Sequence, residues 1–159
     1  MSAGGVAIIL PGRAAGRVSA PPSKSIAHRL LIGAALAGGE SIIRHLAPSE
    51  DMLATTDCLR ALGAEVGDPL SGVCSVRGYG DRVRESGGDL RHLYCRESGS
   101  TLRFLLPLCL LDGVPSVLHG KGRLLSRPLD IYETLCRERG ITFEQNAESV
   151  TVSIPTTLI

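Results

Sequence analysis

Residues 21–29, Pro-Pro-Ser-Lys-Ser-Ile-Ala-His-Arg, gather residue types that bind anions. Lys24 is one of only two lysines among the seventeen cationic side chains, and it lies between Ser23 and Ser25. The prolines keep the incoming backbone extended, and the apolar spacing that follows predicts a helix beginning near Ser23 or Ser25. A helix start exposes unpaired N–H groups and the positive end of the helix dipole. Together with the Arg29 side chain, this predicts a site for a phosphate or a carboxylate.

A second segment, residues 97–103 (Glu-Ser-Gly-Ser-Thr-Leu-Arg), repeats this theme before another apolar run. Gly99 allows a ligand to approach the backbone closely. We expect Ser100 or Thr101 to cap the helix, with Arg103 one turn inside it. Taken alone, this segment fits an ordinary helix cap with a solvated arginine better than it fits a binding site.

The loop at residues 120–128 is the third candidate anion site. It carries two glycines and the cations Lys121, Arg123 and Arg127 ahead of an expected helix. Pro128 holds Arg127 extended and so gives its guanidinium a defined direction. The loop lacks the third glycine of a dinucleotide fingerprint and does not match a P-loop. Alone it fits a basic surface loop equally well, but three such segments at equivalent points of a repeat predict one shared cleft.

The helices and strands that must position these segments are predicted to occur in two copies along the chain. Arg29 matches Arg103, and Gly63 matches Gly140. The first copy predicts a helix at 25–37, a strand at 41–46, a helix from Ser49 to Gly63, and strands at 64–66 and 73–76. The second copy predicts a helix at 100–111, a strand at 116–119, a helix from Pro128 to Gly140, and strands at 141–143 and 150–152. The buried stripe of the last helix is expected to be Leu129, Tyr132, Leu135 and Cys136. Each copy is thus helix–strand–helix–strand–strand, with a strand leading in.

Length and composition favour a single domain with an ordinary core. The chain has 159 residues, of which 43% are hydrophobic, and a formal net charge of +1. The near-neutral charge and the absence of tryptophan argue against a protein that coats nucleic acid or a membrane surface. No apolar stretch reaches the roughly 18–20 residues that span a bilayer. The N-terminus lacks the pattern of a signal peptide.

Five cysteines, at positions 58, 74, 95, 109 and 136, are widely spaced and include no Cys-x-x-Cys pair. This spacing argues against zinc sites and redox motifs, so we expect no metal site. Most of the five fall in apolar runs, where a free cysteine is usually a small buried hydrophobe. Reduced thiols favour a cytoplasmic location.

These motifs resemble the N-terminal part of the 5-enolpyruvylshikimate-3-phosphate (EPSP) synthase family. The matching stretches are residues 22–25 with Arg29, residues 97–103, and residues 120–128. Their order and spacing agree with the family, and the likeness covers nearly the whole chain from Ala7. The resemblance implies an α/β fold (α+β type) of repeated βαβαββ units, three in each of two lobes, with the active site in the cleft between the lobes.

Within that fold, the chain is expected to be an N-terminal fragment that supplies two units of one lobe. Residues 1–20 would be lead-in strands and the crossover between lobes, and residues 21–159 a partial lobe. The partial lobe divides into repeat one (about 21–78), a polar connector (79–97) and repeat two (about 98–159). The third unit, with a Ser-Ser-Gln segment, and the second lobe would follow in the same polypeptide.

The family reaction, as the resemblance implies, transfers the enolpyruvyl group of phosphoenolpyruvate to the 5-hydroxyl of shikimate 3-phosphate, without a metal or an organic cofactor. Lys24 would contact phosphoenolpyruvate and assist proton transfer. Ser25 and Arg29, four residues apart on one helix face, would hold shikimate 3-phosphate. Gly99 would approach phosphoenolpyruvate through its backbone, and Arg127 would grip it. The expected partners are these small molecules rather than nucleic acid or a membrane, and we expect a monomer.

Glu97 departs from the family pattern, in which many members have asparagine. A carboxylate beside an anionic substrate is unfavourable, so Glu97 is not among the expected ligands. We expect the isolated chain to bind anions weakly and not to turn over. Two alternatives stay open. One is a stand-alone phospho-ligand binding module of the same fold. The other is an RNA-processing enzyme of related fold, such as an RNA 3′-phosphate cyclase, which the near-neutral charge and scarce aromatic residues argue against.

Overall fold

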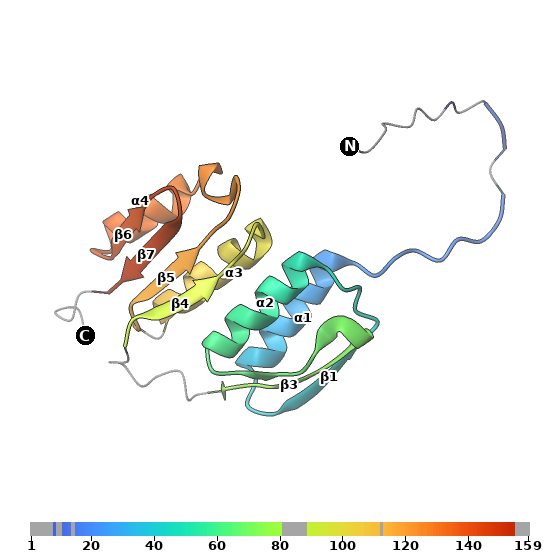
Figure 1. The fold of residues 1–159 in the computed structure, drawn as a ribbon, viewed down its shortest axis with the longest axis horizontal. Helices are drawn as coiled ribbons and strands as arrows, with labels where there is room; N and C mark the ends of the chain where they lie inside the picture. The colour runs from blue at the N-terminus through green and yellow to red at the C-terminus, as the bar shows by residue number, and fades with distance from the viewer. Residues whose placement is uncertain (1–7, 9–10, 14, 81–88, 112, 155–159) are drawn as a thin grey trace.

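Two β-sheets, each covered on one face by two helices, make up the body of the protein (Figure 1). The computed structural model describes residues 8, 11–13, 15–80, 89–111 and 113–154. The first repeat consists of α1 (Lys24–Leu36), β1 (Glu40–Arg44), α2 (Glu50–Ala61), β2 (Glu65–Val66), the 3₁₀-helix η1 (Pro69–Ser71) and β3 (Val73–Arg77). The second repeat consists of β4 (Arg91–Tyr94), α3 (Gly99–Leu111), β5 (Ser116–His119), the 3₁₀-helix η3 (Leu124–Ser126), α4 (Asp130–Glu138), β6 (Thr142–Gln145) and β7 (Ser149–Ser153). This order confirms the repeated helix–strand–helix–strand–strand pattern.

Both helices of the first repeat begin where their sequence predicts. The Ser23 hydroxyl oxygen accepts a hydrogen bond from Ile26 N at 3.4 Å, and that of Ser49 accepts one from Met52 N at 3.2 Å. Each bond satisfies one of the N–H groups that a helix start leaves unpaired. The chain leaves α2 through Gly63, whose φ of 101° lies in the left-handed region that favours glycine.

The two sheets share one strand order but differ by one strand. The first sheet has the order β1-β3-β2, with both pairs antiparallel. The second has the order β4-β5-β7-β6, in which β4 is parallel to β5 and the other pairs are antiparallel. In the parallel pair, Arg91 lies opposite Ser116. The strands β1, β3 and β2 therefore correspond to β5, β7 and β6. No strand among the described residues corresponds to β4 in the first sheet.

The chain before α1 takes no part in either sheet over its described residues. Residues 15–22 are exposed, form no strand and extend away from the body (Figure 1). The expectation that residues 1–20 supply lead-in strands for another lobe therefore stays a prediction. In the second repeat, the lead-in strand is β4, which lies inside the connector expected at 79–97. Residues 81–88 of that connector lie outside the described residues.

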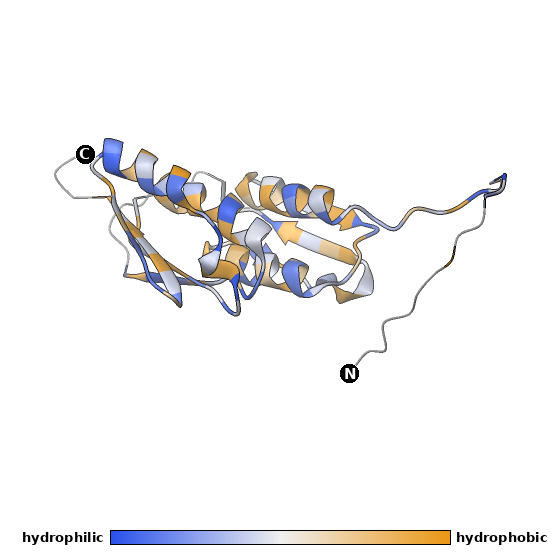
Figure 2. Ribbon diagram, turned by 90° about the horizontal axis from the view of Figure 1, so that it is seen from above, coloured by the Kyte–Doolittle hydropathy of each residue, from blue (hydrophilic) through white to orange (hydrophobic). Residues whose placement is uncertain are grey.

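A single apolar core runs through both repeats. Leu31 of α1, Leu59 of α2 and Leu105 of α3 are fully buried and belong to the same cluster. Since α2 contacts α1, α3 and β4, the helices join the two sheets into one body. Figure 2 shows apolar residues distributed along the helices and strands of this body. All five cysteines are buried and free, which confirms the expectation that they act as small hydrophobes.

The predicted cap of α3 is wrong by two or three residues. The helix begins at Gly99, and its cap is Ser98 rather than Ser100 or Thr101. The Ser98 hydroxyl oxygen accepts a hydrogen bond from Thr101 N at 3.2 Å. A cap must accept from an N–H two or three residues further on. Because the helix already includes Gly99, only Ser98 stands at the right distance.

The start and the buried face of α4 also differ from prediction. The helix begins at Asp130, two residues after Pro128. Leu129 and Cys136 are buried and Tyr132 is partly buried, but Leu135 is 49% exposed. The reason lies in the position of α4, which packs against β6 at the end of the second sheet and is therefore covered along one narrow side.

Pro107 interrupts the hydrogen bonding of α3 from within the helix. Because proline has no N–H, the carbonyl of Arg103 loses its helical partner. The Tyr132 hydroxyl of α4 donates to this carbonyl oxygen at 3.0 Å. Consequently α4 stabilises the first half of α3, which is the half that carries the candidate site.

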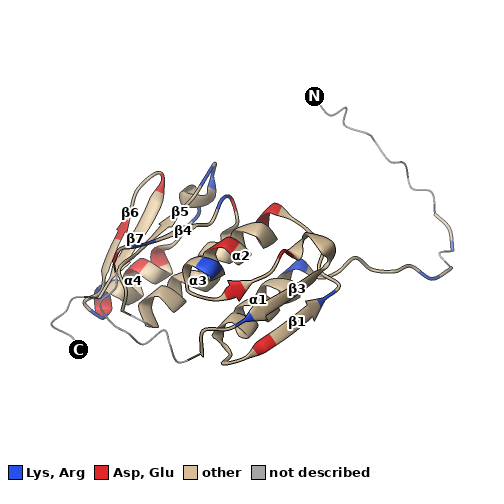
Figure 3. Cartoon of the chain, turned by 60° about the horizontal axis from the view of Figure 1, so that its bottom comes forward, with Lys and Arg blue, Asp and Glu red and all other residues tan. Residues whose placement is uncertain are grey.

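Charged residues are spread over both repeats. Figure 3 shows basic and acidic residues interspersed on the helices, strands and loops. This mixture agrees with the net charge of +1 and differs from the single basic face typical of nucleic-acid-binding proteins. None of the helices that the structure describes has the length and apolar character needed to cross a bilayer.

Candidate anion-binding site

The first turns of α1 place Lys24, Ser25 and Arg29 on the outside of the helix. Lys24 Nζ forms an ion pair with Asp51 Oδ2 of α2 at 2.9 Å. Arg29 Nη1 donates to the Ser25 carbonyl oxygen at 2.8 Å and also to the Ser25 hydroxyl. The four-residue spacing allows this contact, since residues i and i+4 lie on one helix face. The three polar side chains are therefore held in defined directions.

The first turn of α3 is built around Gly99. A Cβ atom on Gly99 would lie 2.6 Å from Arg127 Nη1 and 3.0 Å from Arg103 Nη1. The two guanidiniums therefore occupy space that only glycine leaves free. They lie where the unpaired N–H groups and the helix dipole also favour an anion. Arg103 Nη2 donates in addition to the Pro128 carbonyl oxygen at 3.2 Å.

An open cleft of about 490 Å³ lies in front of these arginines. Its lining residues are Asp51, Glu97, Gly99, Ser100, Arg103, Phe104 and Arg127. They come from the start of α2, the start of α3 and the loop before α4. Two arginines, a helix N-terminus and an aromatic ring suit a small anion with an apolar part. The described residues include no group of three or more His, Cys, Asp or Glu side chains able to hold a metal ion.

Two of the five predicted site residues, Gly99 and Arg127, lie together in the wall of this cleft. Lys24 is not a lining residue. It reaches the cleft through its ion pair with Asp51, which does line it. The third candidate segment therefore lies directly against the second at this cleft, whereas the first reaches the cleft only through neighbouring residues.

Arg29 and Ser25 also lie outside the lining and are connected to it through an aromatic ring. The Arg29 guanidinium lies 4.9 Å from the centroid of the Phe104 ring, a distance suited to a cation–π contact. Phe104 lines the cleft, and Ser25 is hydrogen-bonded to Arg29. A ligand that extends from the cleft toward α1 would meet this pair.

Glu97 lies in the wall of the cleft and packs against the loop at Gly122. A Cβ atom on Gly122 would overlap the Glu97 carboxylate, so the carboxylate fills the space above this glycine. Gly122 has a φ of 56°, in the left-handed region that favours glycine. Beside this contact, the main-chain N–H of Lys121 donates to the carbonyl of Arg96 at 2.7 Å. Glu97 thus has a structural role and also lowers the positive charge of the cleft.

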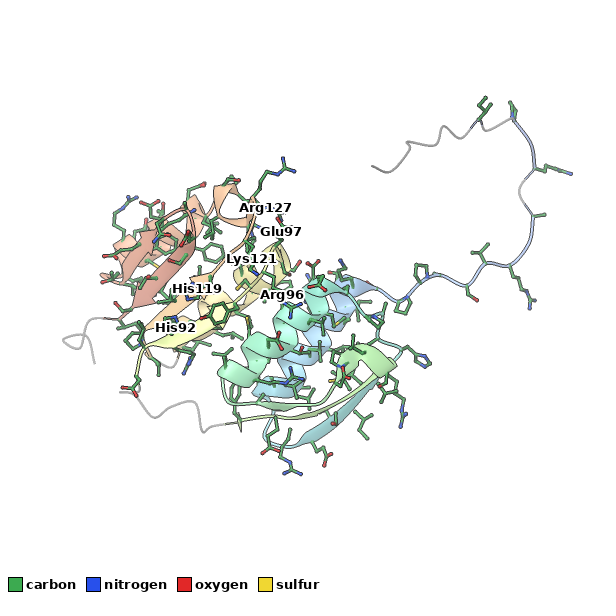
Figure 4. All side chains as sticks on the ribbon, in the orientation of Figure 1. His92, Arg96, Glu97, His119, Lys121 and Arg127 are labelled. Carbon is green, nitrogen blue, oxygen red and sulfur yellow. The ribbon has the colours of Figure 1, made fainter. Side chains whose placement is uncertain are left out.

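Arg96 joins the loop before α3 to the first repeat. Its guanidinium pairs with Glu50 and, at 2.9 Å, with Asp57, both on α2. Its φ of 52° is uncommon for a residue other than glycine and costs some stability. Figure 4 shows Arg96 and Lys121 beside Glu97 at this junction. The ion pairs hold the strained residue and thereby fix the approach to α3.

Asp51 and Phe104 line the cleft, although the sequence assigned neither of them to a site. Asp51 follows the Ser49 cap, where an acid is favoured by the helix dipole alone. Phe104 lies in an apolar helix, where burial in the core is the ordinary expectation. The signal that distinguishes them is three-dimensional, because Asp51 contacts Lys24 and Phe104 contacts Arg29 across helix boundaries.

Comparison with known proteins finds relatives along almost the whole chain. The family model for EPSP synthase (3-phosphoshikimate 1-carboxyvinyltransferase) matches residues 10–157. A 3-phosphoshikimate 1-carboxyvinyltransferase from Clostridium beijerinckii is 40% identical over 138 residues, covering 85% of this chain and 32% of the relative. One from Clostridium botulinum is 41% identical over 136 residues, covering 84% and 31%. The chain thus spans about a third of the length of the curated relatives that it matches.

Solved structures give the same result for the fold. An EPSP synthase structure from Acinetobacter baumannii superposes with a TM-score of 0.73 at 25% sequence identity, covering 87% of this chain and 32% of that one. A second structure from the same organism gives a TM-score of 0.72. The α/β fold that the resemblance implied is therefore confirmed.

Proposed function

The chain belongs to the EPSP synthase family, and on that premise we propose that it forms part of the active site of an enolpyruvyl transferase. The whole protein transfers the enolpyruvyl group of phosphoenolpyruvate to the 5-hydroxyl of shikimate 3-phosphate and releases phosphate. The names of the relatives support the reaction, and the cleft supports the role of this segment. The observation that carries the proposal is the contact of Arg103 and Arg127 with Gly99 at the start of α3.

Repulsion between two phosphorylated reactants is the obstacle that this site is suited to remove. In the reaction, the 5-hydroxyl loses its proton to a base as its oxygen adds to C2 of phosphoenolpyruvate, and C3 gains a proton. The tetrahedral intermediate then loses a proton from C3 and expels phosphate, which restores the double bond. Cationic side chains that neutralise both reactants allow the reacting atoms to approach.

We place phosphoenolpyruvate on the α3 side of the cleft. Arg127 can form two parallel hydrogen bonds with a carboxylate or a phosphate. Gly99 lets the anion approach the main-chain N–H groups at the helix start, where the dipole stabilises negative charge. The fixed position of both arginines against this glycine reduces the entropy lost when the ligand binds.

We place shikimate 3-phosphate beside α1, on Ser25 and Arg29, with Lys24 between the two ligands. The Lys24–Asp51 pair has side chains 54% and 33% exposed, so it contributes only about 0–1 kcal/mol. An incoming phosphate or carboxylate therefore displaces Asp51 from Lys24 at little cost. The released ammonium contacts phosphoenolpyruvate and assists the proton transfer to C3.

The isolated chain, which spans about a third of its relatives, is proposed to bind anions weakly and not to turn over. The remaining charged groups come from the third unit and the second lobe of the whole protein. The working form is proposed to be a cytoplasmic monomer that uses no metal and no organic cofactor.

Isothermal titration of the 159-residue chain with phosphoenolpyruvate tests the binding step. We expect weak, saturable binding that Arg127→Ala abolishes. Arg137→Ala, which removes an exposed arginine from α4, is the matched control and leaves the affinity unchanged. Equal affinities for the wild type and Arg127→Ala would remove phosphoenolpyruvate from this cleft.

Phosphate release by the whole protein tests the chemical step. Lys24→Met and Arg127→Ala should each lower kcat/KM by about a hundredfold or more, the size expected when a group that stabilises transition-state charge is lost. Near-normal rates in both variants contradict the proposal. Phosphate release by the 159-residue chain above its own Lys24→Met control contradicts the statement that the segment is inactive alone.

A further inference from the structure

A buried chain of polar side chains joins three helices behind the cleft. His28 Nδ1 of α1 lies 2.7 Å from Thr55 Oγ1 of α2. Thr55 Oγ1 lies 2.8 Å from Thr101 Oγ1 of α3, which in turn donates to Ser98 Oγ at 2.7 Å. All four side chains are at most 1% exposed, and none of them lines the cleft. These four residues are called the hydroxyl chain below.

Each part of the hydroxyl chain is attached to the start of a helix at or beside the cleft. Ser98 caps α3 and directly precedes Gly99. Thr55 Oγ1 shares its single proton between Thr101 Oγ1 and the main-chain carbonyl oxygen of Asp51, which lies 3.1 Å away at the start of α2. His28 directly precedes Arg29 on α1. The chain therefore connects α1, which carries Lys24, Ser25 and Arg29, with α2 and α3, which both contribute lining residues to the cleft.

Burial makes these hydrogen bonds strongly interdependent. A hydroxyl or imidazole removed from water is destabilised if its partner is deleted, because the remaining group stays desolvated. In a connected network, each bond also orients the proton of the next hydroxyl. The removal of one member therefore releases its neighbours, and with them the helix ends to which they are attached.

His28 ends the hydroxyl chain as a neutral ring. Burial lowers the pKa of His28, Lys24 and Arg29 lower it further, and Asp51 opposes them. Nε2 of this ring has no hydrogen-bond partner among the described residues. A proton on Nδ1 makes His28 a donor to Thr55 and leaves only a lone pair unpaired at Nε2, which is better tolerated than a buried unpaired N–H.

We propose that the hydroxyl chain positions the starts of α1, α2 and α3 relative to one another. The proposal rests on the proposed function in one respect, since Gly99 on α3 is assigned to phosphoenolpyruvate and Ser25 and Arg29 on α1 to shikimate 3-phosphate. Its members touch no substrate and take part in no proton transfer, so they are positioning residues. The sequence offered no sign of them, because serine, threonine and histidine at these places fit caps and helix faces equally well.

Thr55→Val is the decisive variant, because it keeps the side-chain shape and removes the hydroxyl. Thr56→Val is the matched control. Thr56 is the next residue, is equally buried, and its hydroxyl donates only to the Leu53 carbonyl inside α2, at 3.0 Å. Thr55→Ser retains the hydroxyl and should restore wild-type behaviour. If Thr55→Val does not fold, Thr101→Ala and Thr101→Ser repeat the comparison at the next position.

Amide hydrogen exchange gives a readout that needs no ligand. The main-chain N–H groups of Thr101 and Leu102 are bonded to the side chain and the carbonyl of Ser98. We expect both to exchange about tenfold faster in Thr55→Val than in the wild type. Thr56→Val and Thr55→Ser should stay close to the wild type. Equal acceleration in both valine variants would overturn the proposal.

Affinity for phosphoenolpyruvate, measured by titration, connects the hydroxyl chain to the cleft. We expect a loss of about tenfold in Thr55→Val and less than about twofold in Thr56→Val and Thr55→Ser. Faster exchange without a change in affinity would overturn the positioning role. A wild-type chain that binds no phosphoenolpyruvate would overturn the proposed function instead, and the exchange rates would still decide whether the hydroxyl chain holds the start of α3.

Discussion

The two repeats differ most where the chain enters α1 and α3, the helices that carry the candidate anion-binding groups. In the second repeat, β4 is hydrogen-bonded to β5 and leads through a short loop to Gly99. In the first, residues 15–22 reach α1 exposed and without a strand. The start of α3 is therefore held by the sheet, whereas the start of α1 is held by side-chain contacts such as Lys24–Asp51.

Burial of the two helix starts follows from this difference. Ser98, Gly99 and Thr101 are buried, while Lys24 and Ser25 are exposed. The same sequence theme thus gives a buried helix start when a strand leads in, and an exposed one when none does. If the lead-in strand is the cause, substitutions at matched places in the two repeats should have unequal effects.

The largest effect should come from weakening β4. Leu93 is fully buried and lies opposite Leu118, so Leu93→Ala should lower the free energy of unfolding by about 2–5 kcal/mol. Val18, in the lead-in of the first repeat, is 93% exposed, and Val18→Ala should change it by less than about 0.5 kcal/mol. Urea denaturation measures both. Similar losses would show that both lead-in segments are docked, which would break the comparison.

Next in size is the contrast between two helical glycines. Gly99→Ala forces Arg103 and Arg127 away from the start of α3, so phosphoenolpyruvate affinity should fall about tenfold, or about 1.4 kcal/mol. A Cβ atom on Gly33 of α1 would meet no neighbouring side chain or loop within 4 Å, so Gly33→Ala should stabilise the protein by about 0.5–1 kcal/mol. Titration calorimetry and thermal unfolding separate the two outcomes. Unchanged affinity in Gly99→Ala would show that the arginines do not bind the ligand there.

A smaller effect should come from the hydroxyl of Tyr132. Tyr132→Phe leaves the Arg103 carbonyl without a partner, and we expect a loss of about 1 kcal/mol in unfolding free energy. Pro107→Ala restores the helical N–H, so in that background the same change should cost less than about 0.5 kcal/mol. The helix α1 contains no proline and needs no such support. Equal costs in both backgrounds would mean that the carbonyl is not the reason for the contact.

The smallest effect should be the pH dependence of stability near neutrality. Burial lowers the pKa of His28 in the first repeat and, with His92 nearby, that of His119 in the second. Unfolded histidine titrates near pH 6.5 and binds more protons than the folded form below that pH. The free energy of unfolding should therefore decrease as the pH drops below about 6.5. The contribution of these two histidines to the decrease ends once they are protonated in the folded protein as well.

His28→Gln should flatten this pH dependence more than His119→Gln, because His28 is fully buried whereas His119 is partly exposed. Thermal unfolding between about pH 5 and 8 provides the measurement. If stability changes with pH equally in the wild type, His28→Gln and His119→Gln, neither imidazole is the source of the pH dependence.

Local signals in the sequence were sufficient to predict the repeat and the helices of its first copy. Ser23 and Ser49 cap α1 and α2 as predicted, because a cap depends only on residues two or three positions away. Residues 91–94 carried no such signal. Their single buried apolar residue, Leu93, becomes part of a strand because β5 lies beside it, and that pairing is not written in the local sequence.

The cleft itself depended on contacts between distant residues. Gly99 and Arg127 could be predicted through their motifs, but Asp51 and Phe104 could not. Their roles depend on how α2 and α3 pack against α1, which involves partners far away in the sequence. The cap of α3 was misplaced for a different, local reason: Ser98, Ser100 and Thr101 all carry hydroxyls near the helix start, and the backbone becomes helical already at Gly99.

The five buried thiols can report local unfolding of the protein, because each becomes reactive only when its region opens to solvent. Burial raises the pKa of Cys74 in the first sheet and of Cys136 in α4, and a hydrogen bond with Cys58 together with burial raises that of Cys95. Only a thiolate in contact with solvent reacts with a disulfide reagent. Labelling of each thiol will therefore proceed at the rate at which its region unfolds. The order in which the cysteines react will show which repeat unfolds first.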